Sequence, residues 1–140
     1  MQGPMFFLAA LVSSASIASA AVAEVPRGLQ LGSLECNVAR VQILADLAST
    51  RSAVNKISDQ DVQSAASQGL DTARSGILKI AGALITGQTA PQEDRDEVAS
   101  GLNATAQALA SSTNNDTDVA NAQKELSKAA AAGKSVVLNC

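Results

Sequence analysis

The chain contains no tyrosine, tryptophan or histidine, and its only two phenylalanines, Phe6 and Phe7, lie close to the N-terminus. Any domain built after them must form its core from Ala, Val, Leu and Ile, without an aromatic ring. From Ala21 onward there are 27 Val, Leu and Ile residues and 23 Ala residues. Alanine faces let helices approach closely, but each buries little apolar area, so this core is thin for its length.

The first twenty residues are typical of a secretory signal peptide. A short apolar run from Phe6 to Val12 is followed by small residues and by two Ala-x-Ala sites, which end at Ala20 and Ala23. Serines interrupt this region, and the apolar run is shorter than the roughly 20 residues of a membrane span. We expect cleavage after Ala20, or as late as Ala23, and export of the remaining chain without a transmembrane anchor.

The chain therefore divides into a signal peptide at 1–20, an irregular arm at 21–33 and one domain at 34–140. All ten basic and thirteen acidic residues follow the signal peptide, so the exported part keeps the net charge of −3. It offers neither a basic cluster for phosphates nor aromatic side chains on which bases could stack. Nucleic acid is not expected as a partner, and we expect a monomer.

Apolar residues after the arm recur at steps of three and four, which is the period of an α-helix. We expect a first helix from about Ser33 to Ile57, and a second that follows a capping-box-like segment at 58–61 and runs towards Gly87. Thr89 and Pro91 predict the start of a third helix, with Thr89 as the cap. After a polar loop at 111–116, a fourth helix runs to the chain end. The fold class is all-α: an antiparallel bundle of four, or at most five, helices.

The first helix carries two neighbouring apolar stripes. We expect both to face the core, the second widening the first. The first stripe follows Cys36, Ala39, Ile43, Leu47, Thr50, Val54 and Ile57, and the second follows Leu34, Val38, Val41 and Ala45.

Cys36 begins the first helix and Cys140 ends the chain. In an exported protein with two cysteines, one intramolecular disulfide is the simplest expectation. In an up-down bundle both residues lie at the same end, and the bridge contributes roughly 4–5 kcal/mol on the chain-entropy estimate. A free or intermolecular thiol at the C-terminus is the alternative.

Gly69, Gly76 and Gly82 lie inside the second helix, where each costs about 1 kcal/mol relative to Ala. Two interpretations stay open: a tight helix crossing or a kink in the helix, or a wall that leaves room for an apolar guest such as a fatty acid. On the second interpretation, the wall consists of Ile43, Leu47, Leu70, Ala73, Ile77, Ile80, Leu84 and Leu102.

Other patterns do not add up to catalytic or metal chemistry. Asn114, Asp116, Asp118 and Glu125 imitate the ligand spacing of a calcium loop, but Val119 stands where that loop needs Gly. Helix capping by Asp116 or Asp118 explains the same residues. The charged run at 93–97 suits a solvated helix start. We therefore expect no enzyme, no cofactor and no metal.

Two N-glycosylation sequons occur, at Asn103 and Asn115. Asn115 falls in an expected loop and is the better acceptor. Asn103 falls inside the third helix beside Leu102, where chance occurrence is the stronger interpretation.

Several segments resemble small secreted proteins of filamentous fungi. They are Leu34–Arg40 (LECNVAR), the glycine-punctuated stretch Gly69–Ile77 and Gly87–Pro91 (GQTAP), together with the signal peptide. The chain is similar to conidial cell-wall and spore-surface proteins and, in style, to hydrophobic-surface-binding and cell-wall mannoproteins. The resemblance implies a wall or spore-surface location and a non-enzymatic role, structural or in masking the spore from immune recognition. It also implies contact with wall or surface components, and lipid binding as the alternative function.

Overall fold

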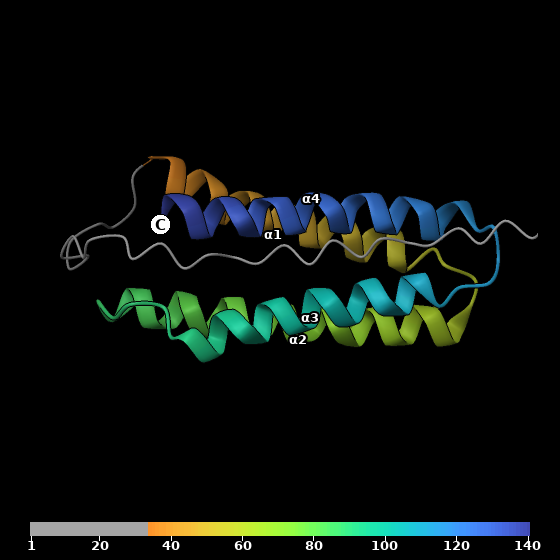
Figure 1. Cartoon of the computed structure of the whole chain (residues 1–140), viewed down its shortest axis with the longest axis horizontal. Helices are drawn as coiled ribbons and strands as arrows, with labels where there is room; N and C mark the ends of the chain where they lie inside the picture. The colour runs from red at the N-terminus through yellow and green to blue at the C-terminus, as the bar shows by residue number, and fades with distance from the viewer. Residues whose placement is uncertain (1–33) are drawn as a thin grey trace, which may run out of the picture.

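The computed structural model describes residues 34–140, which form four α-helices (Figure 1). They are α1 (Leu34–Val54), α2 (Gln60–Ile85), α3 (Gln92–Ala110) and α4 (Thr117–Asn139). The fold is the expected all-α four-helix bundle. The expected signal peptide and arm lie outside the described residues.

The four helices pack as two antiparallel pairs rather than as four equal neighbours. α1 packs on α4 and α2 packs on α3, and each pair forms one layer of the molecule (Figure 1). The connections at 55–59 and 111–116 cross between the layers at one end. The α2–α3 turn and the C-terminus lie at the other end, which we call the disulfide end.

The helix boundaries follow local capping chemistry. The Asp59 carboxylate accepts hydrogen bonds from the backbone N–H groups of Asp61 and Val62 and begins α2. Gly87, with φ of 76°, follows the end of α2, where a residue with a Cβ would be strained. The expected cap at Thr89 is wrong. Pro91 occupies the N-cap of α3 and makes no side-chain cap.

Within the α2/α3 pair, the helix backbones touch through small residues. A Cβ added to Gly69 would lie 2.4 Å from Thr105 Oγ1, and one added to Gly76 would lie 2.8 Å from the Asp94 carbonyl oxygen. At these two positions the tight-crossing interpretation is confirmed. A Cβ on Gly82 would meet no atom within 4 Å, so packing does not require glycine there.

The core shared by all four helices is thickest near the two connections. There α2 contributes Val62, Ala66 and Leu70, and α3 contributes Ala108 and Leu109, all buried. Nearer the disulfide end, the apolar side chains that α2 and α3 add to this cluster are only partly buried, namely Ile77, Val98 and Leu102.

The second apolar stripe of α1 does not face the core, contrary to expectation. Leu34, Val38 and Val41 are exposed by 77%, 57% and 68%, and Ala45 is also exposed. The helix buries the other stripe against its neighbours, including Cys36, Ala39 and Ile43. At 100° per residue the two stripes lie on opposite sides of α1, so one stripe cannot widen the other.

Candidate functional site

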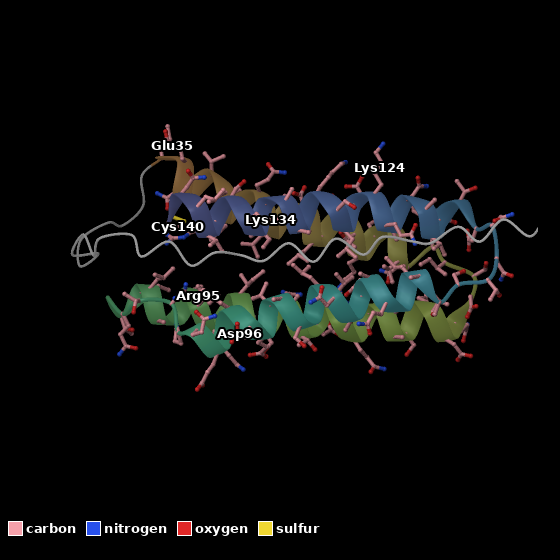
Figure 2. The ribbon with its side chains drawn as sticks, in the orientation of Figure 1. Glu35, Arg95, Asp96, Lys124, Lys134 and Cys140 are labelled. Carbon is pink, nitrogen blue, oxygen red and sulfur yellow. A yellow bond between two sulfur atoms is a disulfide. The ribbon has the colours of Figure 1, made fainter. Side chains whose placement is uncertain are left out.

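A disulfide joins Cys36 in the first turn of α1 to Cys140 directly after α4, as expected. The two Cα atoms are 5.1 Å apart, and 104 residues separate the cysteines in sequence. Cys36 is 1% exposed. In Figure 2, Cys140 and Glu35 lie at the same end of the α1/α4 pair, so the bridge ties the first helix to the last.

The residues expected to line an apolar wall do not share one environment. Ile43, Leu47 and Leu70 are buried in the shared core, and Ala73 is buried at the α2–α3 crossing, where a Cβ on Gly101 would meet its backbone. The remaining four lie towards the disulfide end and are only partly buried: Ile77, Ile80, Leu84 and Leu102.

Polar contacts between the two layers gather in the half of the molecule that holds the connections. Ser58 Oγ donates to Asp116 Oδ2 at 3.2 Å, and Gln123 Nε2 donates to the Leu109 carbonyl oxygen at 3.5 Å. The Arg51 guanidinium pairs with the Asp71 carboxylate between α1 and α2. Towards the disulfide end, partly buried apolar groups such as Ile77 and Val136 pack against the shared core instead.

Large apolar side chains are exposed in the half of the molecule that holds the disulfide. α1 exposes four of them, α4 exposes Val137 and Leu138, and α2 exposes Leu78 and Ile85. Extensive exposed apolar surface is unusual on a monomer and marks an interaction surface. The four on α1 are Leu34, Val38, Val41 and Leu44.

Two shallow grooves open along the same part of α1. One, of about 370 Å³, runs between α1 and α4, and the other, of about 300 Å³, lies over α1. Both include Val38 and Gln42. The larger is lined by Leu34, Glu35, Val38, Ala39, Gln42, Ala132, Ser135 and Asn139.

Asp46 is a buried carboxylate that the sequence analysis missed. Its residue is only 6% exposed, and Oδ1 accepts a hydrogen bond from Gln42 Nε2 at 2.9 Å. Asp46 lies three residues after Ile43 and four before Thr50, which is a buried-face spacing in a helix. That spacing is the signal that could have located it.

The charged residues at the start of α3 lie at the disulfide end of the α2/α3 pair, where Figure 2 shows Arg95 and Asp96. Glu97 Oε2 pairs with Lys79 Nζ of α2 at 2.5 Å. This hydrogen bond holds the pKa of Glu97 below its ordinary value and raises the pKa of Lys79. The pair joins α2 to α3 at the surface of the molecule.

Of the residues that have the ligand spacing of a calcium loop, Asp116 caps a helix and Glu125 forms a surface ion pair. Asp116 is the N-cap of α4, where Oδ1 accepts from the backbone N–H of Asp118 at 2.8 Å. Glu125 pairs with Lys128 on the surface of α4. Within residues 34–140, no three His, Cys, Asp or Glu side chains gather in a way that could hold a metal ion.

The two sequons differ in their surroundings. Asn115 and Thr117 are both exposed, at the α3–α4 connection and the start of α4. Asn103 is exposed on α3, but its partner Thr105 is fully buried and donates to the Gly101 carbonyl oxygen at 2.9 Å. Packing against α2 therefore accounts for Thr105 without a glycan.

Among the helices of residues 34–140, none is long and apolar enough to cross a membrane. Comparison with known proteins finds no matching family model, and no curated protein or solved structure matches the chain significantly.

Proposed function

We propose that this protein is an exported, non-enzymatic component of a fungal cell wall or spore surface, with a structural or masking role. The disulfide between Cys36 and Cys140 is the observation that carries the proposal. Disulfides of this kind form and persist in oxidising compartments, which exported proteins enter. The signal-peptide pattern before Ala21 and the resemblance to conidial wall proteins support the same location.

The bundle also suits a protein that works by its surface. Its outer side combines exposed apolar side chains on α1 with polar groups elsewhere, such as Lys124, which projects away from the bundle in Figure 2. Side chains of this kind can contact wall polymers, lipids or neighbouring proteins without chemical reaction.

Localisation and gene deletion test this proposal. A tagged chain is expected in the wall fraction, with the signal peptide removed, and deletion is expected to change the surface proteome and immune staining of spores. A cytosolic tagged protein together with an unchanged spore surface would rule the proposal out.

A carrier of a fatty acid or another apolar ligand is the second candidate, and one observation favours it. The shared core thins towards the disulfide end, where Ile77, Leu84 and Leu102 are only partly buried, whereas a hydrogen bond ties the two connections at the opposite end. A chain-like apolar ligand inserted between the layers there would bury these side chains further.

Because the chain has no tryptophan, a single introduced tryptophan reports on this site without background. Ile77→Trp places the reporter at the partly buried position, and Leu78→Trp is the control at the exposed neighbour on the same helix. A brominated fatty acid is expected to quench the first and spare the second. Ligand at 100 times its Kd should also raise Tm by roughly 10 °C.

Native mass spectrometry of protein from its own host completes the test. A co-purifying lipid supports the carrier. Equal quenching at both positions, an unchanged Tm and no bound lipid would eliminate it and leave the wall component as the remaining proposal.

A further inference from the structure

The outward stripe of α1, which we define as Leu34, Val38, Val41, Ala45 and Ala48, has the spacing of a helix-packing face. All five residues are exposed. They are separated by steps of four, three, four and three, which is the repeat that seats one helix against another in coiled coils. The buried face of α4 shows the same steps at Ala122, Leu126 and Ala129. The stripe therefore has the spacing of a helix-packing face, but no helix among the described residues packs against it.

The charges around the stripe suit contact with an identical surface. A two-fold contact sets a surface against its own copy, so a surface with net charge repels itself. The stripe carries no charged side chain. Of the charged residues next to it in sequence, Asp46 is buried on the opposite face of α1, and the other two, Glu35 and Arg40, have opposite signs. Contact with an anionic surface would instead favour an excess of Lys and Arg beside the stripe.

The sizes of the side chains also match under two-fold symmetry. The large residues lie at the start of the stripe and the small ones at its end. Antiparallel pairing centred near Val41 sets Leu34 against Ala48 of the other copy, and Val38 against Ala45. Packed helices interdigitate when large side chains of one helix face small side chains of the other. In this arrangement Glu35 lies near Ser49 of the other copy and meets no like charge.

We propose that the outward stripe of α1 is the contact surface of a homodimer, in which α1 pairs antiparallel with α1 of a second copy around Val41. This departs from the monomer expected from the sequence, and it does not depend on where the protein resides. The stripe spans 15 residues, or about 22 Å of helix. A contact of this length falls at the small end of protein interfaces, so the dimer is weak and depends on concentration.

Sedimentation velocity of the disulfide-bonded protein, produced as the full chain through a secretory route, measures the association. The test variant is Val41→Glu and the matched control is Leu138→Glu, since both side chains are largely exposed and lie in the disulfide half. Circular dichroism confirms that each variant keeps its helices. Glutamate at position 41 sets two negative charges against each other at the two-fold axis.

For the wild type, the fraction of dimer is expected to increase with protein concentration up to about 1 mM. Val41→Glu is expected to weaken the dimer affinity by at least tenfold, and Leu138→Glu is expected to leave it unchanged. A wild-type protein that stays monomeric over this range overturns the proposal. So does a dimer that Val41→Glu leaves intact. A monomer that binds alkyl-coated beads through Val41 also overturns it, and assigns the stripe to an apolar surface instead.

Discussion

The backbones of α2 and α3 touch at Gly101 and Ala73. A Cβ atom added to Gly101 would lie 2.3 Å from the Ala73 backbone nitrogen and 2.6 Å from the Gly69 carbonyl oxygen. Backbone atoms of a helix cannot move aside as the end of a flexible side chain can. At this crossing, the short distance between the two helices therefore requires that position 101 carry no Cβ atom.

Gly101→Ala is expected to destabilise the bundle by about 3 kcal/mol, because the helices must separate and the small-residue contacts on both sides are lost. Chemical denaturation measures the change. Ala also has a helix propensity about 1 kcal/mol more favourable than that of Gly. This gain offsets part of the steric cost, so the measured loss of stability is smaller than the steric cost alone.

Gly82→Ala is the matched control, since the same methyl group enters open space within the same pair of helices. We expect stabilisation of roughly 0.5–1 kcal/mol from helix propensity alone. Equal effects of the two substitutions would contradict the close approach at Gly101.

Removing the disulfide by Cys36→Ser with Cys140→Ser is expected to lower the free energy of unfolding by about 4–5 kcal/mol, on the loop-entropy estimate for a large closed loop. Denaturation with and without reductant gives the same comparison in the wild type. Intact mass after alkylation checks the bridge directly. Two alkylated thiols in unreduced, denatured protein are incompatible with it.

The Lys79–Glu97 pair predicts a defined pH dependence. Because the folded-state pKa of Glu97 is lowered, the carboxylate stabilises the fold above its unfolded-state pKa, and this contribution disappears as pH falls through the folded-state value. Because the pKa of Lys79 is raised, its contribution is complete below the unfolded-state pKa and is lost as pH rises through the folded-state value.

Urea denaturation of the wild type and Glu97→Gln should thus differ most near neutral pH, with the difference shrinking in acid below roughly pH 4 and in strong alkali. In a Lys79→Met background the same substitution should leave little pH-dependent difference. A difference that is constant from acid to alkali would show that the ion pair is not its cause.

Expression in a eukaryotic secretory host is expected to add an N-glycan at Asn115, where both sequon side chains are exposed. Glycosidase treatment should reduce the mass of the wild type and leave Asn115→Gln unchanged. Asn103→Gln serves as the control and should still lose mass. Glycosylation at Asn103 alone would reverse this assignment.

The helices could be located from the sequence because their signals are local. Asp59 and Asp116 cap the helices that follow them, and Gly87 follows the end of α2 through its own backbone conformation. These interactions span a few residues, so the sequence shows both partners together. Thr89 failed as a cap because α3 begins three residues later, at Gln92, with Pro91 as its N-cap.

The disulfide could also be predicted from the sequence, because a chain with two cysteines allows only one intramolecular pairing. Burial was not. Both stripes of α1 have helical spacing, so periodicity could not decide that Ile43 is buried and Val41 exposed.

Local patterning thus determined that the chain forms four helices and, to within about three residues, where they begin and end. Only the tertiary structure decided that they form two close pairs, in which Gly69 and Gly101 are indispensable and Gly82 is not. The reason is physical. A helix period states which residues share a face, whereas the partner of that face depends on contacts between residues far apart in the chain, and those exist only in the folded molecule.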